Sequence, residues 1–372
     1  MKFSKVRIMM TVFIAAAILF ACVSCIMSDG QNGEKKDGIS AVGLEQSMNS
    51  NTGKQETTSN PSNVSREITV SNVMELETAV NEANISGNMT ILLNKGTYYI
   101  SKAGSINTGI LVCKENIMFR SKSGNRDDVF IKGDGMDGEV NNIFNVFSSG
   151  FTAQDMTIGW VKQHSIQIHG EYDADRPVMR NLHIVDARSQ MIKISYFQSS
   201  SSRSEDGLVE KCLIEYSAGI GVQYYTGGID GHFCRNWIVR NNTIKGIKSP
   251  ESELAEHAIH FWSSSEGTRV ENNRIIDCDR GIGFGLGDRG HIGGIISGNY
   301  VNTTRDVGIG LENSSNTEVY NNTVYTEKYA NSIEYRFPGT NNCTIRDNVT
   351  NGLIVSRDGG TAKLENNKTG DD

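Results

Sequence analysis

The chain has 372 residues, a formal net charge of −7 and a sequence pI near 5.6. No block of Lys or Arg stands out, so the composition argues against nucleic acid as a partner. An acidic chain can still bind an acidic polymer, but only through a local cationic site.

The N-terminus predicts an export signal over residues 1–21. Three basic residues precede an apolar run that is short and ends in small residues. The letters "LFAC" resemble the lipobox of bacterial lipoproteins, which makes Cys22 the expected lipidation site and Cys25 the second choice. A plain cleaved signal or an uncleaved anchor is the alternative. We therefore expect an exported protein held to a membrane by a lipid anchor, as a cell-surface or outer-membrane/periplasmic lipoprotein, or otherwise a secreted one.

Residues 22–66 predict a flexible tether. They are mostly Ser, Asn, Gly, Gln, Glu and Lys with little apolar periodicity. Such a segment cannot bury enough surface to offset its ordering entropy. Residues 67–372 form the predicted folded domain.

The cysteines beyond the leader match no zinc-binding spacing. They are Cys113, Cys212, Cys234, Cys278 and Cys343. An exported protein can form one or two disulfides from them. We prefer the interpretation that several are small buried hydrophobic residues.

The folded domain opens with a predicted helix at 71–84, which starts at a Ser-Asn pair. Its apolar residues Val73, Leu76, Val80 and Ala83 recur at helical spacing. Residues 89–100 then predict the first strand and turn. A short amphipathic helix is well suited to close the open end of a stack of strands.

From about residue 150 an asparagine recurs at intervals of 19 to 31 residues within "NNTI"-like segments. The position is held by Asn242, Asn273, Asn299, Asn322, Asn348 and Asn367, with Cys212 and Asn181 as its earlier occupants. Repeats of this length with short β-branched runs indicate a β-solenoid. The Asn amides are expected to bond from one coil to the next, as in other stacked ladders.

A second register supports the solenoid. Seven short strands begin at 164, 190, 218, 257, 280, 307 and 331, and their third and fifth residues are apolar. The third residues are Ile166, Ile192, Ile220, Ile259, Ile282, Ile309 and Ile333; the fifth are Ile168, Ile194, Val222, Phe261, Phe284, Leu311 and Tyr335. Because side chains alternate across a strand, both columns are expected to stack in the core.

The helix, "LLNKGTYYI" and the "NNxI" coils together resemble the pectin-lyase-like superfamily over residues 67–372. The resemblance implies an all-β, single-stranded right-handed parallel β-helix with a short N-terminal capping helix. It implies little about activity, because this fold hosts lyases, hydrolases, epimerases, tailspikes and adhesins.

The outward positions of the same strands carry polar, basic and aromatic residues. The first outward column is Gln167, Lys193, Gly221, His260, Gly283, Gly310 and Glu334; the second is His169, Ser195, Gln223, Trp262, Gly285, Glu312 and Arg336. In "DRGIGFGLGDRG" the expected outward glycines are Gly281, Gly283, Gly285 and Gly287. Glycine in a strand lets another group approach the backbone. Either a groove or the packed loop 248–256 is expected above them.

The loop expected after the strand 218–225 carries Tyr225, Asp230 and His232. The order Tyr, Asp-x-His, "NNTI" resembles mannuronan C5-epimerases, with Gly231 in place of their proline. The resemblance implies an acidic, uronate-containing polysaccharide as substrate and proton abstraction at C5, by a lyase or an epimerase.

That chemistry needs a base and a cation that neutralises the uronate carboxylate. His232 or His260 is the candidate base. Lys193 or Arg235 is the candidate cation, and Tyr225 the candidate proton donor. Substrate contacts are assigned to Trp262, Arg235, Gln223, Glu312 and Arg336. The structural alternatives are that Asp230 caps a turn, that His232 is an ordinary loop histidine and that His257 bonds a backbone carbonyl.

Two other functions stay open. A glycoside hydrolase needs two carboxylates, for which Glu312 with Glu334, or Asp277 with Asp279, are candidates. A non-enzymatic carbohydrate-binding or structural solenoid needs neither. The cofactor is unknown; calcium is considered because many lyases of this fold use it, with Asp230, Asp277, Asp279 and Asp288 as its ligands if they gather.

Overall fold

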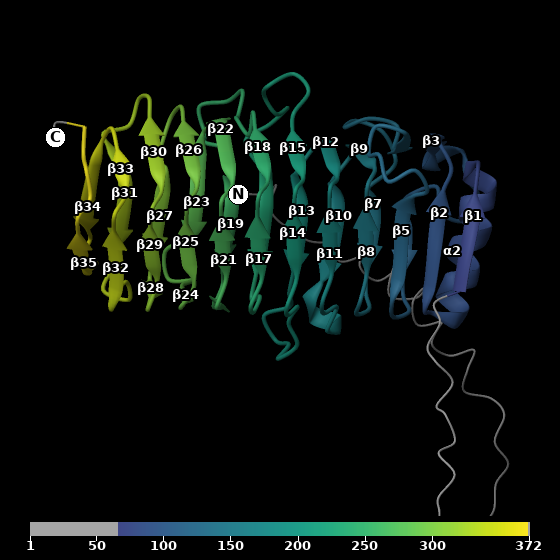
Figure 1. Cartoon of the computed structure of the whole chain (residues 1–372), viewed down its shortest axis with the longest axis horizontal. Coiled ribbons are helices and arrows are strands. Elements are labelled where there is room, and N and C mark those ends of the chain that lie inside the picture. Colours follow the sequence, from purple (N-terminus) through teal and green to yellow (C-terminus); the bar gives the residue numbers. More distant parts are fainter. Residues whose placement is uncertain (1–65, 371–372) are drawn as a thin grey trace, which may run out of the picture. The chain divides into compact units, whose positions relative to one another are not determined.

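The computed structural model describes residues 66–370 and shows a right-handed parallel β-helix, whose coils stack their strands into long sheets (Figure 1). The predicted leader at 1–21, its Cys22 and all of the predicted tether except Arg66 lie outside the described residues. Within residues 66–370, every helix is too short or too polar to cross a bilayer.

Three long sheets and one small sheet carry all the strands in the described residues, and neighbouring strands within them run parallel. Sheet A contains β1 (Arg66–Val70), β2 (Met89–Leu93), β5 (Ile117–Ser121), β8 (Thr152–Gln154), β11 (Val178–Arg180), β14 (Leu208–Glu210), β17 (Ile238–Arg240), β21 (Arg269–Glu271), β25 (Ile295–Ser297), β29 (Glu318–Tyr320), β32 (Cys343–Arg346) and β35 (Ala362–Glu365). Sheet B contains β3 (Gly96–Tyr99), β6 (Val129–Lys132), β9 (Thr157–Val161), β12 (His183–Ala187), β15 (Leu213–Glu215), β18 (Thr243–Lys245), β22 (Arg274–Cys278), β26 (Tyr300–Thr303), β30 (Thr323–Thr326) and β33 (Val349–Thr350).

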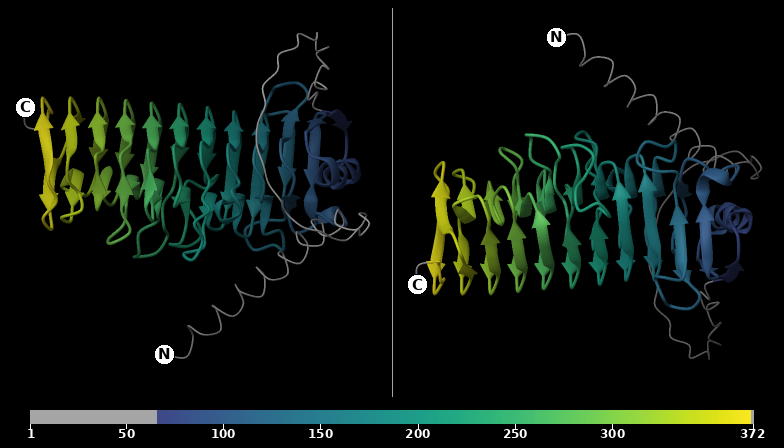
Figure 2. Two further views of the ribbon diagram at one scale, coloured as in Figure 1. Left: turned by 90° about the horizontal axis from the view of Figure 1, so that it is seen from below. Right: turned by 90° about the horizontal axis from the view of Figure 1, so that it is seen from above.

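Sheet C, which carries the candidate site, is the third long sheet. It contains β4 (Ile110–Val112), β7 (Asn142–Val146), β10 (His164–His169), β13 (Gln190–Ser195), β16 (Gly227–His232), β19 (His257–Trp262), β23 (Arg280–Phe284), β27 (Ile309–Glu312), β31 (Asn331–Arg336) and β34 (Leu353–Arg357). Sheet D contains β20 (Ser265–Glu266), β24 (His291–Ile292) and β28 (Ser314–Ser315). The views in Figure 2 show the coils side by side, with longer loops projecting from the middle of the stack.

The predicted capping helix is confirmed as α2 (Val73–Ser86), which lies beside β1 and β2 at the end of the stack in Figure 1. Asn72 caps it, because its side-chain oxygen accepts hydrogen bonds from the backbone N–H groups of Met74 and Glu75. Leu76, with Val80 and Ala83, is buried against the coils. The expectation that 89–100 holds the first strand is wrong, since β1 precedes the helix and pairs with β2. Short 3₁₀ turns follow at η1 (Ile100–Lys102) and η2 (Gly170–Tyr172).

The stacked isoleucine column is confirmed on sheet C, with one correction. Residues 218–225 do not form the predicted strand; Ile220 and Val222 are exposed by 37% and 41%. The strand of this coil is β16, where Ile229 pairs with Ile192 on one side and Ile259 on the other. The correction turns Asp230 and His232 from loop residues into outward residues of a strand.

The asparagine ladder is confirmed. From Asn273 to Asn367, each Asn side-chain oxygen accepts the backbone and side-chain N–H groups of the Asn one coil earlier, at 2.9–3.0 Å. Cys212 occupies the preceding step as predicted, because its backbone N–H donates to Asn242 at 2.8 Å. Asn181 does not belong to the ladder. It lies one residue early, at φ +50°, and the buried Leu182 takes the position.

The buried-cysteine interpretation is also supported. In the described chain, Cys212, Cys234, Cys278 and Cys343 are buried thiols outside any disulfide. Burial raises the pKa of the Cys278 thiol to about 12, so this residue is not a nucleophile at neutral pH.

Candidate functional site on sheet C

Three adjacent strands bring Lys193, Asp230 and His260 together. Lys193 on β13 pairs directly with Asp230 on β16, which pairs directly with His260 on β19. Their neighbours Ile192, Ile229 and Ile259 point into the core, so by alternation the three polar side chains share the outer face. Residues 37 and 30 positions apart in sequence thus become neighbours in one short row.

Asp230 is the centre of this cluster. Its Oδ2 forms an ion pair with the Lys193 ammonium and lies 3.4 Å from Nε2 of His232. Its Oδ1 accepts a hydrogen bond from the indole N–H of Trp262 at 2.8 Å. Lys193 Nζ is also 2.7 Å from His232 Nε2. These contacts leave Asp230 buried but fully paired, so it does not cap a turn.

The charges in the cluster stabilise one another. Burial alone would raise the pKa of Asp230, but the positive charge of Lys193 holds it well below its usual value. Burial alone would lower the pKa of Lys193, but Asp230 and then Tyr225 raise it above the usual value. Burial lowers the pKa of His232, although Asp230 partly opposes the shift. At neutral pH the site therefore holds a charged pair and a neutral imidazole.

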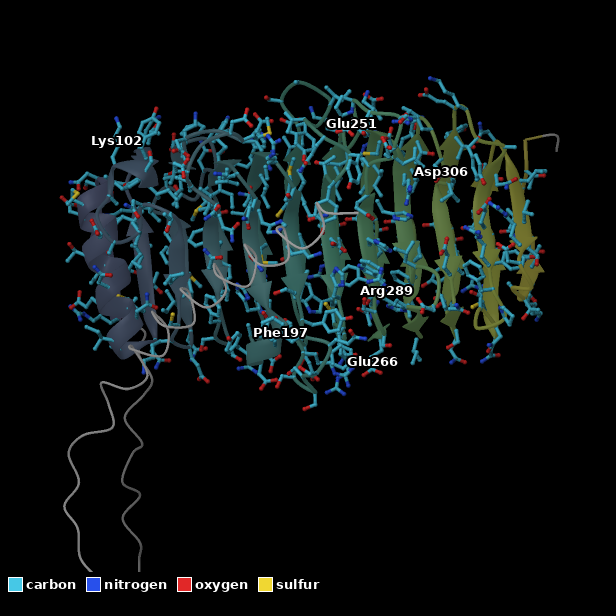
Figure 3. The ribbon with its side chains drawn as sticks, turned by 180° about the vertical axis from the view of Figure 1, so that it is seen from behind. Lys102, Phe197, Glu251, Glu266, Arg289 and Asp306 are labelled. Atoms are coloured by element: carbon cyan, nitrogen blue, oxygen red, sulfur yellow. The ribbon has the colours of Figure 1, made fainter. Side chains whose placement is uncertain are left out.

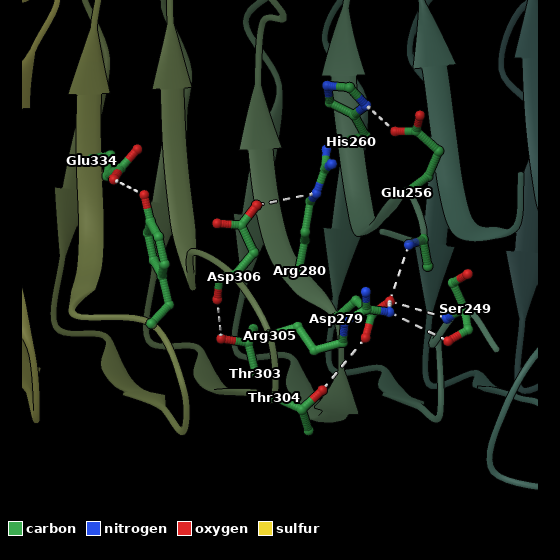
Figure 4. Close-up of polar contacts among 12 residues, drawn as sticks. Ser249, Glu256, His260, Asp279, Arg280, Thr303, Thr304, Arg305, Asp306 and Glu334 are labelled. Carbon is green, nitrogen blue, oxygen red and sulfur yellow. Dashed lines mark hydrogen bonds and ion pairs between the residues drawn. The ribbon is translucent and has the colours of Figure 1, made fainter. Parts of the chain in front are cut away.

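His260 lies deeper than its neighbours. Its side chain has no solvent exposure, and its Nε2 lies 3.1 Å from the backbone oxygen of Gly285. Its Nδ1 faces two carboxylates: Oε2 of Glu256 at 3.4 Å and Oδ1 of Asp230 at 4.0 Å. Figure 4 shows Glu256 and His260 facing each other. His260 thus cannot touch a substrate directly.

Tyr225 and Gln223 lie in the loop before β16. Tyr225 is 45% exposed, and its phenol is near enough to Lys193 to affect the pKa of that amine. Gln223 is not part of the predicted outward column; its side-chain amide donates to the backbone oxygens of Arg188 and Tyr225. His232 takes the place in the column that was predicted for Gln223.

Arg235 and Trp262 do not have the predicted surroundings. Arg235 lies past the end of β16, outside sheet C. It forms ion pairs with Glu205 and Glu266, so it is not the cation beside Asp230. The Trp262 ring stacks on His260 at 4.9 Å between centroids. The guanidinium of Arg289, labelled in Figure 3, lies 3.8 Å from the Trp262 ring centroid. Both contacts use the ring as a support for the cluster rather than as a sugar platform.

A groove of about 480 Å³ lies beside the cluster, over β23, β27 and β31. We call it the sheet C groove. Gly285, Gly287 and Gly310 lie along it, and His257 forms part of its wall. The predicted Glu312 and Arg336 both line it. Of the four glycines predicted to face outward, Gly285 and Gly287 line this groove. The other two do not: a Cβ at Gly283 would lie 2.9 Å from the His257 ring, and a Cβ at Gly281 would meet the core residue Val301 at 2.6 Å.

Acids and arginines alternate along the sheet C groove. Arg336 pairs with Glu312 at 3.0 Å, Arg357 pairs with Glu334 at 3.0 Å, and Arg280 lies 3.3 Å from Asp306. Figure 4 shows the Arg280–Asp306 contact between His260 and Glu334. Burial raises the pKa of Asp306, whereas Arg280 opposes this shift. Such a surface presents both donors and acceptors to sugar hydroxyl and carboxylate groups.

None of the residues that line this groove belongs to the loop 248–256. The buried carboxylate of Asp279 accepts the backbone N–H groups of Ser249 and Ala255, each at 3.0 Å, and pairs with Arg305 at 3.2 Å. These contacts anchor both ends of the loop, which places Glu256 against His260. Asp279 is therefore structural, and Asp277 pairs with Lys248 at 2.6 Å.

The aspartates considered for calcium do not gather. Among residues 66–370, the one group of metal-ligating side chains close enough to share an ion is Glu256, His257 and His260. Asp230, Asp277, Asp279 and Asp288 form no such group in this part of the chain.

Sequence reasoning missed Glu256, Arg280 and Arg357. The sequence signal for Glu256 is its position, since it is an acid directly before the strand "HAIHFW". Arg280 begins its strand as His257 begins the preceding one, and the two are paired in register. Arg357 follows from continuing the Glu312–Arg336 column by one coil.

Comparisons with known proteins agree with the fold. Residues 251–369 match the family model described as a right handed beta helix region. No curated protein sequence matches the chain. A tailspike protein of Escherichia coli bacteriophage HK620, solved as a double mutant, is similar in structure with a TM-score of 0.52 and 14% identity. The match covers 79% of this chain and 61% of the tailspike chain, so this chain spans less than two thirds of that protein.

Two epimerase structures are also similar. The A-module of an Azotobacter vinelandii mannuronan C-5 epimerase gives a TM-score of 0.49 at 11% identity, covering 79% of this chain and 93% of the module. A periplasmic alginate epimerase gives a TM-score of 0.44 at 11% identity, covering 76% of this chain and 77% of its own. At these low sequence identities, the similarity shows the fold alone.

Proposed function

We propose that this protein acts on an acidic, uronate-containing polysaccharide by removing the proton at C5, as a lyase or an epimerase. The observation that carries the proposal is the contact among Lys193, Asp230 and His232. It joins a buried cation, its carboxylate and a neutral imidazole on the outer face of sheet C, the sheet that also carries the groove.

Lys193 is the group that neutralises the uronate carboxylate. Its side chain is 12% exposed, and Asp230 keeps it protonated. Proton abstraction next to a carboxylate builds negative charge on the carboxylate oxygens, and a fixed ammonium stabilises that charge. A cation that is held in place by a buried partner needs little reorganisation when the charge develops.

His232 is the base. Its side chain remains 11% exposed, whereas that of His260 is completely covered. Its Nδ1 lies 3.2 Å from Ser263 Oγ, so a Nδ1–H tautomer donates there and leaves the Nε2 lone pair toward Lys193. When the substrate carboxylate takes over the Lys193 ammonium, this lone pair is released for the C5 proton.

Tyr225 is the proton donor. It is exposed and lies near Lys193, on the loop that borders the row. In the proposed reaction the C5–H bond breaks and its proton goes to His232. Return of a proton to C5 from the opposite face inverts the sugar; transfer to the departing C4 oxygen, with formation of the C4–C5 double bond, cleaves the chain.

The sheet C groove binds the neighbouring sugars. A polysaccharide laid across the strands meets a new coil about every 4.8 Å, so it passes from the Lys193 row over the glycines to Arg336 and Arg357. Arginine forks can hold uronate carboxylates, and the paired acids accept bonds from hydroxyl groups.

The test is hydrogen exchange at C5 in heavy water. The full-length protein is incubated with polymannuronate, polyguluronate, polygalacturonate or a glycosaminoglycan, and deuterium at C5 is measured by NMR. Elimination is followed in parallel through the ultraviolet absorbance of the unsaturated product. Lys193→Met should lower the rate by about 10²–10³-fold, and His232→Asn by about 10²–10⁴-fold.

His183→Asn is the matched control. His183 also contacts a carboxylate, Glu215 at 2.8 Å, but it lies on sheet B. Its rate should equal that of the parent protein. Binding of polymer without any C5 exchange would instead make the protein a carbohydrate-binding solenoid, and full activity in both site variants would remove the row from the mechanism.

Hydrolysis is a second candidate, favoured by one observation. Asp306 has a raised pKa in the groove that also holds Glu312 and Glu334, and a glycosidase needs one protonated and one ionised carboxyl group. Release of reducing ends without an unsaturated product, abolished by Asp306→Asn but not by Lys193→Met, would establish hydrolysis in place of C5 chemistry.

For localisation, we propose export and lipid attachment at Cys22, which rest on the leader sequence alone. Metabolic labelling with a radioactive fatty acid should mark the parent protein and not Cys22→Ala. Loss of label only in Cys25→Ala would move the attachment to the second cysteine.

A further inference from the structure

Glu256, His257 and His260 form a group that the proposed C5 chemistry does not use. Glu256 ends the loop 248–256, and the two histidines lie on β19. One donor atom from each residue lies within 4.8 Å of the donor atoms of the other two. The histidine ring centroids are 4.5 Å apart.

Three donor atoms in this group are buried and make no hydrogen bond within residues 66–370: Nδ1 of His257, Nδ1 of His260 and Oε2 of Glu256. The last two lie 3.4 Å apart, whereas Nδ1 of His257 has neither a hydrogen bond nor an ion pair among these residues. His257 is 7% exposed and His260 is 0% exposed, so the side chains that carry the two nitrogens are more than nine-tenths buried. Buried polar atoms without a partner are uncommon, which indicates a ligand that the protein atoms do not supply.

The orientation of His260 supports the same conclusion. Its Nε2 lies 3.1 Å from the backbone oxygen of Gly285 and donates to it, which directs Nδ1 toward Glu256. A histidine that binds a metal typically donates its other N–H to a carbonyl or carboxylate in this way. Without a cation, the Nδ1 lone pair of a neutral His260 would face two carboxylates.

The neighbouring coil leaves room for His257. A Cβ at Gly283 would lie 2.9 Å from the His257 ring, so glycine at this position lets the imidazole lie flat over β23. His257 also forms part of the wall of the sheet C groove. The group is therefore closed toward the core and adjoins the groove.

We propose that Glu256, His257 and His260 bind one divalent transition-metal ion, with zinc as the best fit. Two imidazole nitrogens and one carboxylate oxygen suit such an ion better than calcium, which prefers oxygen ligands alone. Two donors on one zinc ion are at most about 4.2 Å apart, so the side chains must close slightly on binding. The groove side leaves a further coordination position for water or a sugar oxygen.

The test is metal binding by the full-length protein, which is independent of the proposed C5 chemistry. After chelator treatment, ZnCl₂ is titrated by calorimetry, and Co²⁺ is added in a separate titration to follow its visible absorption. One equivalent of zinc should bind. His257→Ala and Glu256→Gln should each weaken zinc binding by at least about ten-fold.

His183→Ala is the control here as well, since His183 and Glu215 form a histidine–carboxylate pair that belongs to no three-donor group in the described chain. It should keep the parent affinity. Failure to find saturable binding, or unchanged affinity in both site variants, overturns the proposal. Circular dichroism of Glu256→Gln, a nearly isosteric change, checks that loss of binding is not loss of fold.

Discussion

At the scale of single residues, Asp230 decides how the cluster is held together. It pairs with the Lys193 ammonium, lies 3.4 Å from His232 Nε2 and accepts a hydrogen bond from the indole of Trp262, while its own charge is buried. A buried ion pair adds little net stability compared with apolar residues, but removing one partner strands the other charge. The stability of the site therefore depends on keeping both the Asp230 carboxylate and the Lys193 ammonium.

We expect Asp230→Asn to destabilise the fold by about 3 kcal/mol, because it leaves the Lys193 ammonium buried without a carboxylate. Adding Lys193→Met to this variant should recover most of the loss. Urea denaturation of the parent, both single variants and the double variant measures the coupling. Additive losses in the double variant would show that the pair does not act as a unit.

His291 predicts how stability depends on pH. It is fully buried, and burial lowers its pKa to about 3. In the unfolded chain this histidine has a pKa near 6.5, so between pH ~6.5 and pH ~3 the unfolded chain binds a proton that the folded chain does not bind. Stability from this residue is therefore complete above pH ~6.5 and falls as the solution is acidified toward pH ~3. At pH 5 the loss is about 2 kcal/mol.

His291→Gln should remove that contribution. Its destabilisation relative to the parent should be about 2 kcal/mol smaller at pH 5 than at pH 8, because only the parent loses stability through its buried histidine in acid. Denaturation at the two pH values gives the comparison. An equal difference at both would mean that His291 takes up a proton inside the fold.

At the scale of elements, the asparagine ladder links the coils. Asn299 accepts two N–H groups from Asn273 and donates to Asn322 and to the backbone oxygen of Val270. Asn299→Ala leaves these buried groups unpaired and should cost about 2–4 kcal/mol. The exposed Asn341→Ala is the control and should stay within about 0.5 kcal/mol of the parent in the same denaturation experiment.

The glycines of sheet C differ in what they tolerate. A Cβ at Gly310 would make ordinary contacts, 3.5 Å from Val307 and 4.0 Å from His257. Gly310→Gln should therefore fold normally while its side chain fills the groove, and polyuronate binding should weaken by at least ten-fold, or about 1.4 kcal/mol. Affinity electrophoresis measures the binding. Unchanged binding would place the polymer elsewhere.

Gly285→Ala makes a useful contrast on the same sheet. Gly285 has φ +79°, and its Cβ would lie 1.8 Å from the backbone oxygen of Glu312. We expect this variant to lose more than about 1 kcal/mol of stability, which separates glycines that shape the groove from those that the backbone requires.

At the scale of the whole molecule, most of the fold could be predicted because its signals repeat. Apolar alternation places one isoleucine per coil, and "NN" pairs mark each turn. The first Asn of a pair takes a positive φ, +57° at Asn241 and +55° at Asn272, and the second joins the ladder. Leu182 shows why the pattern fades upstream, since an apolar residue can fill the ladder position when no amide precedes or follows it.

The strand β16 could not be predicted for a physical reason. In "GGIDGH" only Ile229 is a large inward residue, because Phe261 on the next coil fills the space above Gly231: a Cβ there would lie 2.6 Å from the Phe261 ring. The preceding "AGIGVQY" alternates better but forms a loop. The pairing of Lys193 with Asp230 thus depends on a neighbour's bulk, which no single-strand pattern records.

The ladder has one further consequence. Each carboxamide turns its oxygen toward the earlier coil and its NH₂ group toward the later one, from Asn242 through Asn348. The small dipoles therefore all add along the axis, and the column has a polarity like that of a helix although it contains no helical residue. A duplicated coil inserted between two such amides would meet a donor behind it and an acceptor ahead of it, so the molecule can lengthen without redesigning its interior.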